Sequence, residues 1–460
     1  MSSTRESLHG LWSSRWVFIL AAAGSAVGLG NIWRFPYLTG ENGGGAFVII
    51  YLGFVLLIGI PLMVAETIIG RRGRRSPVNA ILLIAEEESL SRRWSGLGLM
   101  GIIAGFLTLS FYSVVAGWSL AYVYFVLTSS FATANSISSE AIFTNLISSP
   151  LQLLFWHTLF MGSVVWIVSK GVSLGLERAV KILMPLLFVM LVLMTIYSLL
   201  VGDALGATKY LFATDFSSLT SDVILLAVGQ AFFSLSLGMG ALMIYGSYLP
   251  HDASIPRTCL IVGCVDTLVA LLAGFLIFPI VFAYGLEAGQ GPGLVFVTLT
   301  VAFADMPFGQ VFGFTFFLLL TVAAWTSAIS LLEPVVAWSV ESRGWSRNRA
   351  SWLAGGVIWL IGILCLLSFN ELKDFTPGGR NIFDWSEYIS ANVLLPLGGF
   401  LVAVFVGWRV SRMTIASEFG GNGSKLYSSW VFLLKYWLYY PALIDDKSFL
   451  LICLRWNDRI

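Results

Sequence analysis

Long apolar segments separated by short polar links run through almost the whole chain, and they restrict the fold more than any other feature. A helix needs about 20 mostly apolar residues to cross a bilayer. Eleven segments qualify: residues 14–38, 44–70, 96–128, 151–169, 178–202, 222–248, 258–285, 308–341, 351–370, 384–410 and 428–450. Backbone polar groups within a bilayer must pair internally, so each segment is expected to be helical. The sequence therefore predicts an all-α polytopic membrane protein with about 11 transmembrane helices.

The composition agrees and argues against other classes. Of the 460 residues, 57% are hydrophobic and 11% are charged, whereas soluble proteins average about 25% charged residues. A net charge of +1 does not favour a nucleic-acid partner. The four cysteines and three histidines lack the spacing of a metal site. Because no Ser/His/Asp set or carboxylate dyad is recognisable either, we expect no enzymatic activity.

Lys and Arg residues indicate the orientation of the spans. Most of them fall in links that share the side of the N-terminus, including the run at residues 71–75. Such links face the cytoplasm, so we expect a cytoplasmic N-terminus in a bacterial-type inner membrane. The expected division is a cytoplasmic segment (1–13), a first five-helix repeat (14–202), an extracellular connection (203–221), a second five-helix repeat (222–410), and a cytoplasmic loop with helix 11 and a tail (411–460). Residues 129–150 and 286–307 form the longest outer links, and the glycine-rich second link is expected to be a cap or lid.

Two of the apolar segments are interrupted in the middle. The first segment contains AVGLGNIWRFPY at residues 26–37, and the sixth contains GQAFFSLSLGMG at residues 229–240. Paired glycine-interrupted spans in the two halves of a transporter indicate its binding site. Free N–H groups at a half-helix N-terminus suit a carboxylate, and freed carbonyl oxygens suit a hard cation. The alternative is that these glycines only permit close helix packing.

Four motifs together carry a resemblance to a known family. GSAVGLGNIWRFPY, ENGGGAF, GQAFFSLSLGMG and WTSAISLLEP resemble the neurotransmitter:sodium symporter family, and within it the bacterial leucine and multi-hydrophobic amino-acid transporters. The resemblance covers residues 8–410, and it implies a 5+5 inverted-repeat transporter fold with broken helices 1 and 6. Members usually have twelve spans, so this chain looks one short.

The resemblance also implies two Na⁺ sites built from oxygen ligands. The first would use Ala26, Asn31, Ser234 and Asp266, completed by the carboxylate of the substrate. The second would use Gly24, Val27, Ala323, Thr326 and Ser327. The alternative for the two hydroxyls of helix 8 is back-bonding within their own helix.

Asp266 departs from the pattern of the chloride-dependent members, which carry Asn at this position and Ser where this chain has Ala270. A carboxylate inside a membrane costs roughly 2.5–3.5 kcal/mol and is usually functional. We hypothesise that Asp266 supplies the charge that chloride supplies elsewhere, so that transport is chloride-independent, and that it can carry a proton on the return step. Tyr51 and Gln230 match other members of the chloride site and are expected to hydrogen-bond Asp266. The alternative is a structural pairing with a neighbouring helix.

The same resemblance outlines the substrate pocket and its substrate. The expected pocket residues are Ala26, Leu29, Gly30, Thr108, Tyr112, Phe233, Ser236, Met239, Ser327 and Leu331. Monoamine transporters of the family carry Asp where this chain has Gly28, so the substrate here should bring its own carboxylate. No further charged residue belongs to the pocket, and its far end is mainly apolar. The resemblance therefore implies a small neutral, mostly hydrophobic L-amino acid.

Two gates are expected around this site. Arg34 would meet Glu387, or alternatively Asp384, on the outside. Trp12 and Glu341 match the inner gate, but His9 stands where the family has its gating Arg. The chain is thus expected to be a sodium-coupled symporter that works by alternating access in the lipid bilayer, with no required protein partner. A non-transporting amino-acid sensor on the same fold is the main alternative, whereas a channel lacks a filter-like repeat.

Overall fold

The computed structural model describes residues 5–128, 136–212, 215–289, 294–421 and 425–436. This part of the chain forms helices and contains no strands. The α-helices are α1 (Arg15–Ala26), α2 (Phe35–Glu41), α3 (Gly45–Phe54), α4 (Ile60–Gly73), α5 (Pro77–Glu87), α6 (Ser95–Leu127), α7 (Ser136–Ser148), α8 (Pro150–Ser169), α9 (Arg178–Val201), α10 (Ala204–Phe212), α11 (Ser221–Ser234), α12 (Ala241–Ser247), α13 (Ile255–Ala283), α14 (Leu299–Asp305), α15 (Gly309–Arg343), α16 (Arg347–Leu367), α17 (Ile382–Tyr388), α18 (Leu395–Val404), α19 (Arg412–Phe419) and α20 (Lys425–Tyr436).

Short π-helical turns join several of these helices into longer spans. They cover Gly30–Arg34, Val55–Gly59, Val172–Glu177, Leu294–Thr298, Ile389–Leu394 and Phe405–Arg409. Three further turns are 3₁₀-helical: Arg92–Trp94, Phe216–Ser218 and Pro377–Gly379.

Within the described residues, eight continuous helices are long and apolar enough to cross a membrane, and the bent pair α1–α2 makes a ninth. Nine of the eleven expected spans correspond to these. The segment 222–248 instead forms two short helices, α11 and α12, and much of the segment 428–450 lies outside the described residues. The polytopic helical architecture is thus confirmed, whereas the count of eleven is not.

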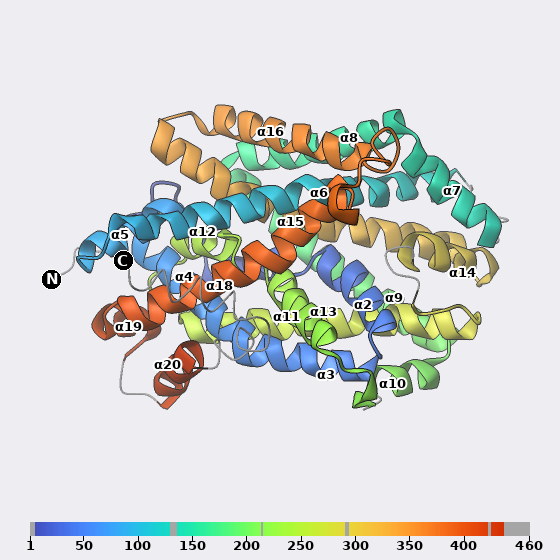
Figure 1. Ribbon diagram of the computed structural model, residues 1–460, viewed down its shortest axis with the longest axis horizontal. Helices are drawn as coiled ribbons and strands as arrows, with labels where there is room; N and C mark the ends of the chain where they lie inside the picture. The colour runs from blue at the N-terminus through green and yellow to red at the C-terminus, as the bar shows by residue number, and fades with distance from the viewer. Residues whose placement is uncertain (1–4, 129–135, 213–214, 290–293, 422–424, 437–460) are drawn as a thin grey trace.

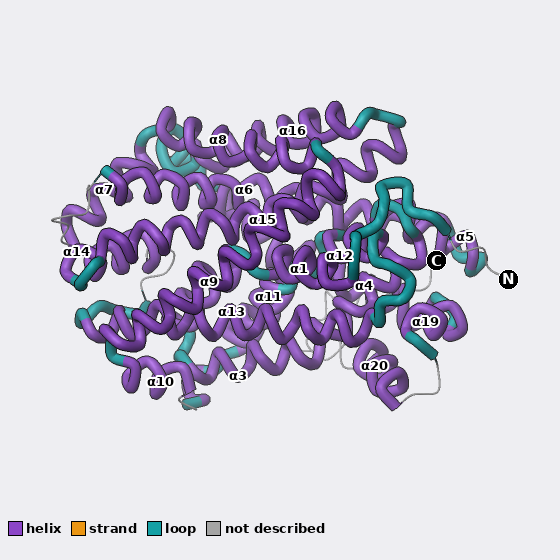
Figure 2. Tube along the Cα trace, turned by 180° about the vertical axis from the view of Figure 1, so that it is seen from behind, coloured by secondary structure: helices purple, strands orange, loops and turns teal. Residues whose placement is uncertain are grey.

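The long helices run side by side, and the ends of the bundle differ (Figure 1). The N-terminus, α5, α12 and α19 gather at one end, and α7, α10 and α14 gather at the other. Viewed from behind, α1, α11 and α12 lie among the longer helices (Figure 2). Both broken segments are therefore surrounded by other helices, as unpaired backbone at membrane depth requires.

The first break lies where glycines replace good helix formers. Helix α1 ends at Ala26, and Val27 takes an extended conformation with ψ 104°. The chain resumes as the π-turn Gly30–Arg34 and then α2, and the two halves meet at 46°. The expected break at Gly28 and Gly30 is confirmed.

The second break contains three residues with positive φ. Gly238 and Gly240 have φ 76° and 73°, and Ser236 has φ 53° between them and α11. A left-handed conformation is uncommon for a residue with a side chain. Glu66 on α4 supports this strained stretch, because its Oε1 accepts a 2.7 Å hydrogen bond from the N–H of Gly238. The intramembrane Glu66 thus contacts the backbone of a broken helix.

Both long links contain helices that the apolar pattern did not indicate. Helix α7 lies in the first link, and the π-turn Leu294–Thr298 with α14 lies in the second. The second link also passes close to α2, since a Cβ on Gly40 would collide with the carbonyl of Ala288. The link thus lies against α2, while residues 290–293 lie outside the described part and its expected role as a cap or lid stays a prediction.

Candidate functional site

A fully buried polar cluster lies beside the first break. Asn31 on the π-turn donates to Asp266 Oδ1 on α13 at 2.7 Å and to Ser234 Oγ on α11 at 3.0 Å. The Ser234 hydroxyl lies 2.9 and 2.8 Å from the two carboxylate oxygens of Asp266. Tyr51 on α3 reaches both residues, at 3.1 Å from Ser234 Oγ and 3.4 Å from Asp266 Oδ2. Three of the four expected residues of the first ion site thus meet, and the fourth, Ala26, ends α1 at the same break.

The donor chemistry of this cluster fits a hard cation. Its atoms are carboxylate, hydroxyl and amide oxygens, which sodium-like ions prefer over nitrogen or sulfur. Asn31 turns its amide nitrogen towards Asp266, while its Oδ1 accepts from the N–H of Gly28 at 3.2 Å. Coordination of an ion by Oδ1 would require the amide to turn over, which would also free the N–H of Gly28.

Gln230 was expected to hydrogen-bond Asp266, but its side-chain amide bonds two other groups. Its Oε1 accepts from Arg34 at 3.2 Å, and its Nε2 donates to the carbonyl of Gly30 at 2.8 Å. Gln230 therefore connects the first break to the outer end of the site. Tyr51 makes the expected contact with Asp266.

A second oxygen cluster joins the end of α1 to the middle of α15. Thr326 Oγ1 lies 3.5 Å from the carbonyl of Val27 and 2.9 Å from that of Ala323. Ser327 Oγ lies 3.4 Å from the carbonyls of both Gly24 and Val27. All five residues expected at the second ion site thus lie together. Their three carbonyls and two hydroxyls again form a set of neutral oxygen donors, and the extended Val27 turns its carbonyl out of the helix.

Gly28 lies between these clusters, against Tyr112 of α6. The Tyr112 hydroxyl accepts the N–H of Leu29 at 3.1 Å. A Cβ on Gly28 would come within 2.8 Å of that hydroxyl and would collide with Ser327 Oγ. The packing around Gly28 therefore admits no side chain at this position.

The remaining pocket residues surround the second break. Phe233 lies against Gly30, where a Cβ would be 3.0 Å from its ring, and Ser236 donates to the carbonyl of Ser25 at 2.8 Å. Met239 and Leu331 both approach Gly105 of α6: a Cβ there would lie 3.2 Å from the Met239 carbonyl and 3.6 Å from the Leu331 carbonyl.

Two residues of this region were missed by the sequence analysis. Thr108 Oγ1 is 2.5 Å from Ser390 Oγ in the π-turn Ile389–Leu394, so the hydroxyl expected to contact substrate already has a partner. Gly105 lies three residues before Thr108 and shares its helix face. That spacing could have identified Gly105, whereas no local signal marks Ser390.

Arg34 lies at the end of the site that is expected to face outwards. Its Nε lies 3.3 Å from Glu387 Oε1, and its guanidinium lies 4.9 Å from the ring centre of Phe233. Of the two carboxylates considered, Glu387 makes the contact. The Arg34 side chain thus contacts Glu387 on α17, Phe233 and Gln230.

The inner end is closed by a network centred on Glu341. His9 Nε2 lies 2.8 Å from Glu341 Oε1, with both side chains buried. Ser76 and Asn79 also donate to Glu341, at 2.5 and 2.7 Å. Trp12 donates to the carbonyl of Tyr245 on α12 at 3.2 Å. Arg5 pairs instead with Glu87 at 3.3 Å, so His9 and not Arg5 contacts Glu341.

Two broken helices that meet at buried oxygen clusters, with polar closures at both ends, define a secondary transporter. The comparisons with known proteins agree. The model of the sodium:neurotransmitter symporter family matches residues 9–146 and 147–442. A sodium-dependent transporter of Bacillus subtilis strain 168, YhdH, is 38% identical over 92% of this chain and 94% of its own length. A sodium-dependent transporter of Haemophilus influenzae is 35% identical over 88% and 90%.

A solved structure is also similar. The crystal structure of MhsT in complex with L-phenylalanine has a TM-score of 0.89 and 46% identity, covering 95% of this chain and 98% of that one. The chain belongs to the sodium:neurotransmitter symporter family. It is a sodium-dependent, multi-pass membrane symporter and not an enzyme.

Proposed function

We propose that this protein takes up neutral, mostly hydrophobic L-amino acids into the cell together with two Na⁺ ions. The observation that carries the proposal is the fit around Gly28. A substrate carboxylate needs an N–H donor and a hydroxyl, and the N–H of Leu29 and the hydroxyl of Tyr112 meet at the break, where they bond each other at 3.1 Å until a carboxylate takes their place. A side chain on residue 28 would block these groups, because the contacts around Gly28 admit none.

Coupling follows from the position of the first oxygen cluster. Asn31, Ser234 and Asp266 provide part of an ion's shell, and the carboxylate of the substrate completes it. Amino acid and ion thus each favour the binding of the other, a reciprocity that linkage requires. The second ion binds between Val27 and Thr326, where it holds α1 against α15.

The substrate class follows from the far end of the pocket. Met239 and Leu331 are apolar, so this end of the site favours an apolar side chain over a charged one. The Thr108 hydroxyl is engaged by Ser390, which reduces its availability to a polar side chain. L-Phenylalanine, the ligand of the similar MhsT structure, is therefore the first substrate to test.

Asp266 makes chloride unnecessary in this proposal. Its carboxylate is surrounded by Asn31, Ser234 and Tyr51, and no described cation pairs with it. The charge of the first ion balances it during uptake, and a proton takes that place on the return step. The transporter lies in a bacterial-type inner membrane with a cytoplasmic N-terminus, so the His9–Glu341 gate opens to the cytoplasm and the Arg34–Glu387 gate opens to the outside.

Uptake into proteoliposomes tests the proposal. Labelled phenylalanine, leucine, tryptophan and glycine are offered with an inward Na⁺ gradient, with K⁺ in place of Na⁺, and with gluconate in place of chloride. We expect sodium-driven accumulation of the large hydrophobic amino acids and equal rates in gluconate. Sodium-dependent binding without accumulation would indicate the sensor alternative. Binding that is indifferent to sodium would refute both ion-site assignments.

A further inference from the structure

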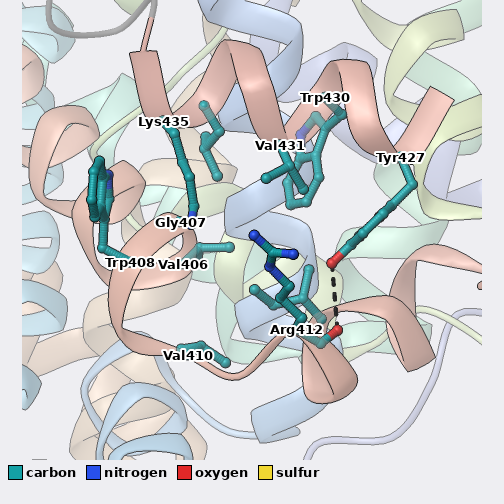
Figure 3. A pocket seen from close by; sticks show the side chains of 11 residues that line it. Val406, Gly407, Trp408, Val410, Arg412, Tyr427, Trp430, Val431 and Lys435 are labelled. Atoms are coloured by element: carbon teal, nitrogen blue, oxygen red, sulfur yellow. Dashed lines mark hydrogen bonds between the residues drawn. The ribbon is translucent and has the colours of Figure 1, made fainter. Parts of the chain in front are cut away.

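A cavity of about 210 Å³ lies outside the transport pathway, where the end of helix 10 turns back towards α20. The π-turn Phe405–Arg409, the start of α19 and one face of α20 enclose it (Figure 3). Trp430 fixes α20 beside this turn, because its indole donates to the carbonyl of Pro61 on α4 at 3.0 Å. The cavity is therefore built by tertiary packing, and none of its lining residues belongs to the sites described above.

Two cations line this cavity. Figure 3 shows the Arg412 side chain between the turn and α20, while the Lys435 side chain descends from α20 towards Gly407. The Lys435 ammonium lies 5.0 Å from the ring centre of Trp408. Neither cation forms an ion pair with any described residue.

Two arginines close to this cavity, in contrast, are paired. Arg71 contacts Glu418 at 2.6 Å, and Arg72 pairs with Glu87. Glu88 accepts from Ser411 at 2.9 Å. The nearby carboxylates thus have other partners, and two positive charges face one cavity without an anion from the described chain.

The surface around the cavity is apolar and exposed. Met413 is 81% exposed and Phe432 is 53% exposed, and Trp408 and Tyr436 pack together with ring centres 6.2 Å apart at the same rim. Trp and Tyr are typical of the interface between the hydrocarbon and the headgroups. A ligand here would meet two cations inside the cavity and lipid-facing apolar side chains at its edge.

We propose that this cavity binds the phosphate of an anionic phospholipid, with the acyl chains lying along the apolar rim. Arg412 would hold phosphate oxygens through its planar guanidinium, and Lys435 would act as a second point charge. Basic pockets between membrane helices are typical sites for such headgroups. Inorganic phosphate could make the same ionic contacts, but it has no acyl chains to pack against the apolar rim.

Native mass spectrometry of the full chain in detergent tests this proposal. The probes are phosphatidylglycerol, phosphatidylcholine with the same acyl chains, and inorganic phosphate. The double variant R412Q/K435Q removes both cations. The matched control R93Q/K425Q removes two exposed cations that do not line the cavity. The conservative variant R412K/K435R keeps both charges.

We expect the wild type to prefer phosphatidylglycerol, and R412Q/K435Q to bind it about 30-fold more weakly, from two contacts near an anionic headgroup. The control and the conservative variant should bind as the wild type does. Equal losses in R412Q/K435Q and R93Q/K425Q would overturn the proposal. Equal competition by inorganic phosphate would assign the cavity to a soluble anion instead. If only a variant without residues 437–460 prefers phosphatidylglycerol, the occupant of the cavity in the full chain is the chain's own tail and not a lipid.

Discussion

The substitution Gly28→Ala tests the central part of the site with a single methyl group. A Cβ at this position would lie 2.8 Å from the Tyr112 hydroxyl and 3.2 Å from Ser327 Cβ. Favourable contacts of carbon atoms begin at about 3.5 Å, so Tyr112 would have to retreat by about 0.7 Å. The 3.1 Å bond from the N–H of Leu29 would then exceed hydrogen-bond range.

Two costs add up in this variant. Overpacking a filled site costs about 1–3 kcal/mol, and losing one buried hydrogen bond costs about 1 kcal/mol more. The sum of about 2–4 kcal/mol corresponds to a loss of roughly 30- to 1000-fold in affinity. Because Ser327 also belongs to the second oxygen cluster, the sodium dependence should shift together with the amino-acid affinity.

Equilibrium binding of labelled phenylalanine to detergent-purified protein, at several sodium concentrations, measures both effects. Gly162→Ala is the matched control, because a Cβ there meets no atom within 4 Å. Thermal unfolding of both variants separates a damaged site from a damaged fold. If the Gly28→Ala protein is stable and binds within about threefold of the wild type, the space beside Tyr112 is not where the substrate carboxylate binds.

Four further predictions follow from individual contacts. Asp266→Asn should make uptake chloride-dependent, because it removes the fixed charge beside Asn31 and Ser234; equal rates in chloride and gluconate would contradict the charge-substitution hypothesis. Thr326→Val should raise the half-saturating sodium concentration about tenfold, from one lost oxygen ligand, whereas Ser339→Ala, which removes a hydroxyl bonded only within α15, should leave it unchanged. Glu66→Leu removes the acceptor of the N–H of Gly238 and should lower phenylalanine affinity by about tenfold; an unchanged affinity would mean that the second break holds its shape without this side chain. His9→Ala removes one of three side chains that contact Glu341 and should change the uptake rate by about tenfold through a weaker closure; an unchanged rate would exclude His9 as a part of this closure.

The sequence predicted those parts of the site that local chemistry determines. Glycines in an apolar segment cannot be explained by lipid contact, so both breaks were predictable from Gly28, Gly30, Gly238 and Gly240, and the structure confirms them. The spans were predictable wherever the apolar run is continuous, because about 20 mostly apolar residues in a row are long enough to cross a bilayer as a helix. Segment 222–248 was expected as one broken span, and the structure divides it into α11 and α12, with Ser236 in a left-handed conformation between them.

Contacts between distant segments were harder to predict. The amide of Gln230 could bond either the carboxylate of Asp266 or the groups beside Arg34, and only the packing of α11 against the first break selects the second. Thr108 likewise shows no sign in its own sequence that Ser390, 282 residues later, will take its hydroxyl. Side-chain partners across a bundle depend on the rotation of each helix by fractions of a turn, which apolar periodicity constrains only loosely.

The contacts of Glu341 show how a departure from the family pattern can be accommodated. His9 stands where the resemblance places a gating Arg, and its Nε2 lies 2.8 Å from Glu341 Oε1. An imidazole lacks the planar fork with which Arg binds a carboxylate at two points. Ser76 and Asn79 donate to the same carboxylate, so three side chains share the contacts that one Arg could make. Removal of the imidazole should therefore weaken this closure without dismantling it.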